Sequence, residues 1–213
     1  YASRYMKIYG ANGSSGEELT AITRTFLSEI ERERRNHADN QRSSQSEEFI
    51  GKRPAQEEMA EIKVLRCDAG KVFDDARFRQ LLEEKGIRLR AAATDAQWQN
   101  RIERHIGTAK ESALAMLDAA NLRVEFWFSA LRTAVLLKNL IPLSDTAMHS
   151  EGLSPRERYS GQAILRRELA SLHTFGALVF RHIPRDRRRA LSDKGAAGVF
   201  IGYDDADRNT YVV

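Results

Sequence analysis

The sequence has very little cysteine and proline, and it has no long apolar run. Cys67 is the single cysteine among 213 residues, which excludes an internal disulfide and any zinc site built from several cysteines. So little cysteine is typical of a reducing compartment, so we expect the cytoplasm or the nucleus. No stretch approaches the roughly 20 apolar residues that a membrane helix needs, so we expect no membrane partner.

The N-terminus also lacks several features. "YASRYMKIYG" has no initiator methionine, no signal-peptide pattern and no acidic residue. Residues Arg4–Tyr9 alternate as in a β-strand, so the sequence opens inside a predicted strand and we expect a fragment of a longer protein. With 42% hydrophobic residues, the chain has enough apolar material for one domain and part of another.

Hydrophobic periodicity predicts alternating helices and strands, interrupted by one polar insertion at Asn36–Ala60. The predicted helices are Glu17–Arg35, Asp74–Ile87, Asp95–Ala120, Val124–Ile141 and a short helix with Ser154 as N-cap and Pro155 at its first position. The predicted strands are Arg4–Tyr9, Glu61–Cys67, Ile87–Thr94, Phe175–Ile183, Gly198–Asp204 and Thr210–Val213. This order predicts an α/β domain followed by a small β unit. Within the apolar helix we expect Trp127 to be a core residue.

Two acidic residues stand out by position. Asp68 follows a buried-strand pattern directly, and Glu103 lies inside the long helix, with 34 residues between them. Carboxylates from a strand end and a neighbouring helix can converge on a hard divalent cation, which prefers oxygen ligands. Two such cations can activate a hydroxyl nucleophile and stabilise the leaving oxygen of a phosphodiester. The spacing alone is not specific, because many acidic pairs exist in this chain.

Several stretches resemble the integrases of copia-type retrotransposons, in the same order along the chain. "VLRCDAGKVF" is similar to their "V-L-R-T-D-N-G-G-E-F", and "FWFSALRTAVLLKNLIP" to "F-W-x-x-A-x-x-T-A-x-x-L-x-N-x-x-P". "QWQNRIERHIGTAKESALAML", "LSPRERYSG", "LHTFGALVFRHIP" and "KGAAGVFIGYD" resemble further motifs of the family. The resemblance covers nearly the whole chain apart from the insertion. It implies that the chain is a fragment of a Pol polyprotein.

The resemblance implies a ribonuclease-H-like mixed sheet flanked by helices, without its first strand, followed by part of a small SH3-like β module. We therefore expect an integrase catalytic core at residues 1–165, containing the insertion at about 36–60, and a linker with the start of the SH3-like module at 166–213. The implied activity is Mg²⁺- or Mn²⁺-dependent strand transfer, which joins element DNA to target DNA. Asp68 and Glu103 correspond to catalytic, metal-binding carboxylates of the family. The resemblance also implies a homo-oligomer for the intact integrase.

Basic residues complete the expected site. Lys110 lies seven residues after Glu103, about two helical turns on, so both share a face and Lys110 is expected to contact DNA phosphate. The arginine-rich segment Arg181–Arg189 is either a solvated linker or a non-specific contact with DNA phosphates. Because the resemblance implies a DNA substrate, we favour the second interpretation. It assigns DNA binding to Arg185, Arg187, Arg188 and Arg189.

The sequence departs from the family pattern in ways that affect activity. The family's first catalytic aspartate belongs on a strand before Arg4–Tyr9, so we expect the chain as given to lack one of three catalytic carboxylates and to be inactive. After Asp68 the family's Asn-Gly-Gly-Glu is replaced by Ala69–Val72, and a glycine is missing before Glu103. The alternative is a non-catalytic DNA- or protein-binding module derived from a decayed integrase.

Overall fold

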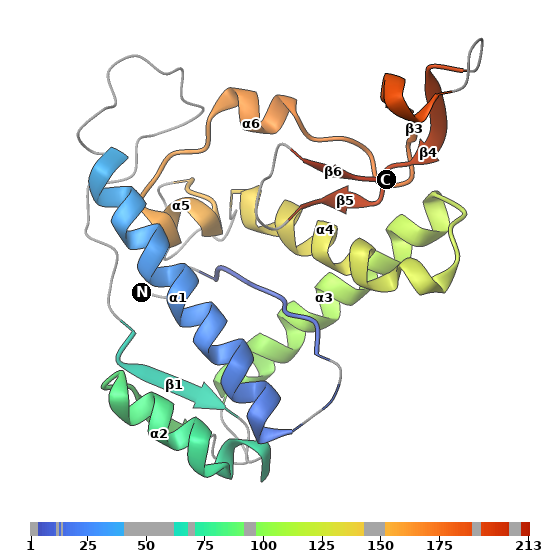
Figure 1. The fold of residues 1–213 in the computed structure, drawn as a ribbon. Helices are drawn as coiled ribbons and strands as arrows, with labels where there is room; N and C mark the ends of the chain where they lie inside the picture. Colours follow the sequence, from blue (N-terminus) through green and yellow to red (C-terminus); the bar gives the residue numbers. More distant parts are fainter. Residues whose placement is uncertain are drawn as a thin grey trace.

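A computed structural model describes residues 4–11, 13, 15–40, 62–67, 71–91, 97–142, 152–188, 193–204 and 210–213. Its N-terminal half contains α1 (Gly16–Asn40), β1 (Val64–Cys67), η1 (Lys71–Asp74), α2 (Ala76–Glu84), β2 (Arg88–Ala91) and α3 (Gln97–Ala119). It continues with η2 (Val124–Phe126), α4 (Trp127–Leu140), α5 (Pro155–Ser160), α6 (Arg166–Ala170), β3 (Leu178–His182), η3 (Arg185–Arg187), β4 (Gly195–Val199), β5 (Gly202–Tyr203) and β6 (Tyr211–Val212). Figure 1 shows their arrangement. No helix in the described ranges is long and apolar enough to cross a membrane.

The first unit is a parallel strand pair with a helical crossover. β1 and β2 are parallel, with Val64 opposite Arg88 and Cys67 opposite Ala91, and α2 connects them. Asp75 caps α2 by accepting hydrogen bonds from the N–H groups of the second and third helical residues. Gly86 follows the helix with a φ of 65°, the left-handed conformation that glycine adopts most easily. The predicted strand–helix–strand order is confirmed here.

The core of this unit lies between α1, α2 and the two strands. Leu27 of α1 is buried with Phe78 and Leu82 of α2 and with Ile87, which leads into β2. Phe73 packs edge to face on Phe78, with ring centroids 5.8 Å apart. Helix α1 continues to Asn40, so the polar insertion predicted from Asn36 begins at least five residues too early. The rest of the predicted insertion lies outside the described residues.

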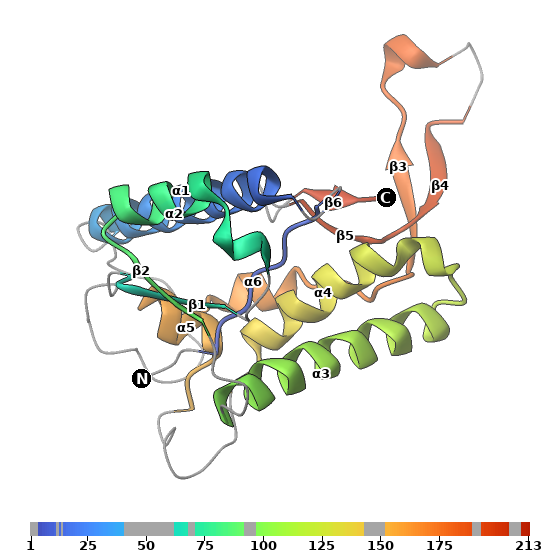
Figure 2. The ribbon, with the colours of Figure 1, turned by 90° about the horizontal axis from the view of Figure 1, so that it is seen from below.

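A second core lies between the long helices α3 and α4 (Figure 2). Ala113 of α3 and Ala130 and Ala134 of α4 are buried there together with Phe175, which precedes β3. Small side chains let two helix backbones approach closely. The prediction that Trp127 belongs to the core is wrong, because its side chain is 54% exposed. Trp127 is the first residue of α4, ahead of the alanines that α4 buries in this core.

The N-terminal segment Arg4–Tyr9 does not belong to a strand in the described structure, and Arg4 has a φ of 59°, so the predicted strand is wrong there. The side chain of Asn139 on α4 replaces a strand partner. Its Oδ1 accepts a hydrogen bond from the Met6 N–H at 3.0 Å, and its Nδ2 donates to the Met6 carbonyl at 2.7 Å. An amide side chain carries one acceptor and two donors, so it can satisfy both backbone groups of one residue.

The C-terminal part confirms several local predictions. Ser154 caps α5 in a capping box with Glu157, and Pro155 occupies the first turn. Three β segments were predicted; the structure contains β3 and β4, which form an antiparallel hairpin, and β5 and β6, which form a second one. Helix α6 was not predicted. The described strands form three two-stranded sheets, so the ribonuclease-H-like and SH3-like assignments and the division at residue 165 stay predictions.

Substitutions of Asn139 test whether its amide holds the N-terminal segment in place. Replacing Asn139 with Ala removes two hydrogen bonds, and we expect the free energy of unfolding to fall by about 2 kcal/mol. Asn139→Asp should also destabilise, because a carboxylate accepts from the Met6 N–H but repels the Met6 carbonyl. Urea unfolding measures both effects. Lys138→Gln, at the neighbouring position of α4, serves as the control, and equal effects of all three substitutions would contradict this account.

Candidate functional site

The two predicted catalytic carboxylates differ in what the structure describes. β1 ends at Cys67, whose side chain is buried, and Asp68 comes next but lies outside the described residues. Glu103 lies on α3, as predicted, with an exposed side chain that forms no ion pair within the described part of the chain. The structure therefore leaves the convergence of Asp68 and Glu103 as a prediction. Within the described residues no group of three or more His, Cys, Asp or Glu side chains could hold a metal ion.

Lys110 also lies on α3, and its side chain is exposed. The helix is continuous between Glu103 and Lys110, which confirms that two turns separate them. Ala113 and Leu117, further along α3, are buried in the second core, whereas the side chains of Glu103 and Lys110 are exposed. A phosphate contact by Lys110 stays a prediction.

His105 lies two residues after Glu103 and is half-buried. Burial lowers its pKa below the ordinary 6.5, and the positive charges of Lys138, Arg4 and Arg104 lower it further. The influence of Arg4 and Lys138 shows that the start of the N-terminal segment and the end of α4 approach the first half of α3. Three basic side chains therefore carry positive charge near His105.

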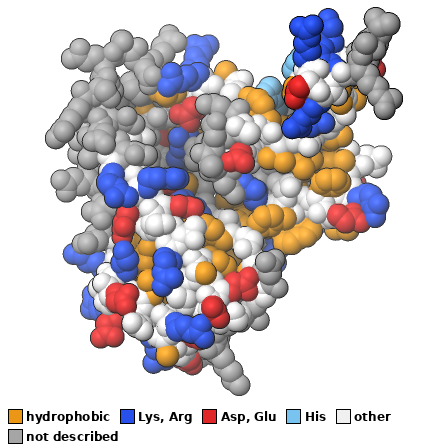
Figure 3. Space-filling model, in the orientation of Figure 1, with side chains coloured by type: hydrophobic (Ala, Val, Ile, Leu, Met, Phe, Trp, Pro, Cys, Tyr) orange, Lys and Arg blue, Asp and Glu red, His pale blue; other side chains and the backbone are white. Residues whose placement is uncertain are grey.

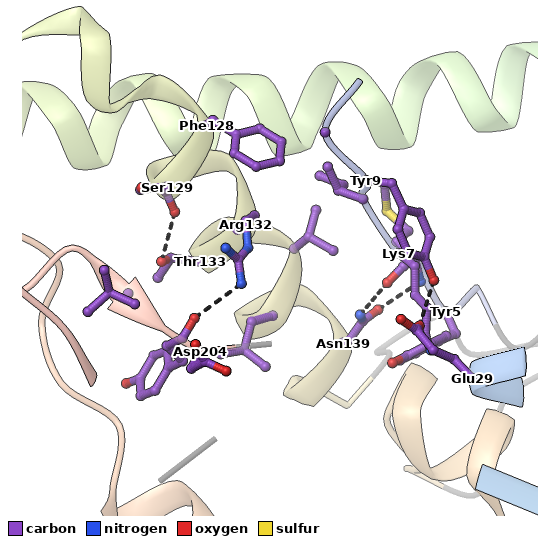
Figure 4. Close-up of a pocket in the computed structure, with 18 of the residues that line it drawn as sticks. Tyr5, Lys7, Tyr9, Glu29, Phe128, Ser129, Arg132, Thr133, Asn139 and Asp204 are labelled. Carbon is purple, nitrogen blue, oxygen red and sulfur yellow. Dashed lines mark hydrogen bonds and ion pairs between the residues drawn. The ribbon is translucent and has the colours of Figure 1, made fainter. Parts of the chain in front are cut away.

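A cavity of about 420 Å³ lies between the N-terminal segment, α1, α4 and the β5–β6 hairpin (Figure 4). Sequence reasoning did not find it. At one end Lys7 forms ion pairs with Glu29 and Glu33 of α1, both at 3.0 Å, and the Tyr9 hydroxyl donates to Glu29 at 2.7 Å. At the other end Arg132 of α4 donates to the Tyr203 carbonyl at 3.2 Å. Two sequence features could have indicated this cluster. Tyr5, Lys7 and Tyr9 alternate along the segment, and Glu29 and Glu33 lie four residues apart on one helix.

The pKa shifts of Lys7, Glu29, Tyr9 and Tyr159 favour their ordinary protonation states near neutral pH. Burial opposes the charge on Lys7, but its hydrogen bonds to Glu29 and Glu33 outweigh burial and raise its pKa. Burial likewise raises the pKa of Glu29, but hydrogen bonds from Tyr9 and Lys7 leave it lowered overall. Burial, followed by the nearby glutamates, raises the pKa values of Tyr9 and Tyr159. The cluster therefore fastens the segment to α1.

The arginine-rich segment lies at the end of the β3–β4 hairpin. Figure 2 shows this hairpin projecting from the body of the molecule, and Figure 3 shows Lys and Arg side chains gathered on it. Arg185 and Arg187 belong to η3 and are exposed. Arg188 has a buried Nε with no hydrogen-bond partner in the described part of the chain. Arg189 lies outside the described residues. The structure thus brings three of the four predicted arginines to one projecting tip.

Comparison with known proteins supports a retrotransposon Pol-derived region. The chain is 29% identical over 147 residues to the retrovirus-related Pol polyprotein from transposon TNT 1-94 of Nicotiana tabacum. The aligned region covers 68% of this chain and 10% of that polyprotein. No protein-family model matches the chain.

The environment of His105 predicts a pH dependence of stability. Because its pKa is lower in the folded chain than in the unfolded chain, the unfolded chain binds more protons as the pH falls below 6.5. Stability should therefore decrease as the pH is lowered from neutral through 6.5, and His105→Gln should weaken this decrease. Urea unfolding at several pH values measures it. His182→Gln, an exposed site on β3, is the control, and an unchanged pH profile for His105→Gln would refute the assignment.

Proposed function

We propose that this chain is part of a retrotransposon integrase, with residues 1–165 forming the core of a metal-dependent polynucleotidyl transferase of ribonuclease-H-like fold. The observation that carries the proposal is the similarity to a Pol polyprotein over 68% of the chain. The integrase-like motifs, which occur in order along the sequence, point to the integrase region within such a polyprotein. The chain aligns with 10% of that polyprotein, so assigning any of the polyprotein's activity to this chain is a proposal.

Local structure supports the assignment at three points. β1 and β2 are parallel, and in open α/β sheets ligands bind outside the carboxyl ends of such strands. Asp68 directly follows β1. Glu103 lies on the long helix that follows β2, and its side chain is exposed rather than committed to the core. These positions are compatible with a site shared by the strand end and the helix.

The proposed site would hold Mg²⁺ or Mn²⁺ through Asp68 and Glu103. Carboxylate oxygens are the donors that these hard cations prefer, and Glu103 forms no ion pair within the described residues that would compete with a cation. When bound, the cations supply activation of a hydroxyl nucleophile and stabilisation of the leaving oxygen. Lys110, exposed on the same helix, would position a DNA phosphate, and the positive charges of Lys138, Arg4 and Arg104 around His105 favour an anionic substrate.

The basic hairpin is the second proposed DNA contact. Its arginines contribute no ion pairs within the described residues, so their charge is available to phosphates. This interaction is non-specific, and its strength should fall with rising salt, because releasing counterions into a more concentrated salt solution gains less entropy. The same hairpin favours the second candidate function, a DNA-binding module without catalysis. Its arginines could bind DNA whether or not Asp68 and Glu103 form a metal site.

Metal binding separates the two functions. Calorimetric titration with Mn²⁺ should give binding to the unmodified chain and none to Asp68→Asn/Glu103→Gln, because the double substitution removes the carboxylate charge while keeping the size of both side chains. Glu111→Gln, which changes an exposed glutamate on the same helix, should bind as the unmodified chain does. A folded chain that binds no metal, or a double variant that binds it equally well, would refute the integrase-type site and leave the binding module.

A further inference from the structure

The β3–β4 hairpin has one open apolar face. Leu178 and Phe180 alternate on β3, so they point to the same face of the hairpin, and their side chains are 68% and 74% exposed. Phe180 lies opposite Ala197 on β4, which is too small to cover a phenyl ring. A large aromatic side chain exposed to this degree on a strand is costly in water unless another molecule covers it.

The opposite face of the hairpin differs. Gly198 lies on that face, and a Cβ atom built there would meet the side chain of Val213 at 2.4 Å, so the C-terminal residues pack closely against it. One face is therefore supported by the protein, and the other is open. The hairpin projects away from the helices in Figure 2, which leaves the open face accessible to a large partner.

The tip of the hairpin indicates the kind of partner. The backbone N–H of Ile183 donates to the Lys194 carbonyl at 2.9 Å, which closes the ladder just before η3 and its arginines. A second copy of this chain would present an equally positive tip, which disfavours pairing of two tips. An anionic partner complements the tip, and the bases of a nucleic acid offer apolar faces beside the phosphates.

We infer that the β3–β4 hairpin is a DNA-binding arm whose tip arginines hold phosphates while Phe180, supported by Leu178, stacks on or wedges against an unstacked base. This inference rests on the proposed DNA-binding function and specifies its preferred substrate, DNA that is kinked or carries unpaired bases. Apolar side chains inserted at base steps and aromatic rings stacked on single bases are established ways of binding such DNA.

The test compares two DNA probes of identical ends, an intact duplex and the same duplex with a two-nucleotide bulge flanked by 2-aminopurine. Fluorescence anisotropy gives the affinity of the full chain for each probe. Phe180→Ala should weaken binding to the bulged DNA by between about five-fold and 100-fold, with little change for the intact duplex. Phe180→Trp should restore it, and the 2-aminopurine emission should respond to binding of the Trp variant but not of the Ala variant.

Two control variants make the outcomes distinguishable. Arg185→Ala/Arg187→Ala/Arg188→Ala should weaken both DNAs similarly and reduce the slope of log affinity against log salt by about 2 to 3. Trp127→Ala, which removes an exposed aromatic ring of α4 rather than of the hairpin, should change neither affinity.

The arginine variant could lose DNA affinity while Phe180→Ala binds the bulged probe as tightly as the unmodified chain does. In that case the arm contacts DNA, but the proposed contact of Phe180 with a base is refuted. If the unmodified chain binds neither probe at low salt, both the DNA-binding function and the inference fail. If Phe180→Ala changes only the oligomeric state, measured by light scattering, the open face is a protein interface and the inference is overturned.

Discussion

The arrangement of this molecule depends on how one short extended segment is held between two separate cores. One core lies between α1, α2 and the β1–β2 pair, and the other lies between α3 and α4. The segment Arg4–Tyr9 is bound to α4 through the Asn139 amide and to α1 through the ion pairs of Lys7. The Tyr5 ring stacks on Tyr159 of α5 at a centroid distance of 4.3 Å, which adds a third attachment.

This constraint has a consequence for the proposed site. β1, whose end precedes Asp68, belongs to the first core, and Glu103 lies on a helix of the second. Any site that uses both residues therefore depends on the relative position of the two cores, which the extended segment helps to set. Partial burial makes these attachments stronger than surface ion pairs of the same length, because solvent screens the half-buried Lys7 less.

Local rules in the sequence predicted much of the structure. Gly86 ends α2 and Ser154 with Glu157 starts α5 because caps are set by a few neighbouring residues. Long-range packing decided where prediction failed: the Asn139 amide, 133 residues away in sequence, takes the place of a strand partner for Met6. Trp127 looks like a core residue in an apolar helix, but it is the first residue of α4 and its side chain is exposed. The proposed acidic pair came from resemblance rather than geometry, and Asp68 lies outside the described residues.

Convergence of Asp68 and Glu103 is the central claim, and proximity can be measured without metal or DNA. In a Cys67→Ser background, Asp68→Cys/Glu103→Cys should be joined efficiently by a short bifunctional thiol crosslinker. Asp68→Cys/Glu111→Cys, with the second cysteine about two turns further along α3, should react far less. Efficient crosslinking of the 68–103 pair alone would support a shared site of strand end and helix. Equal or absent crosslinking in both folded variants would contradict the account.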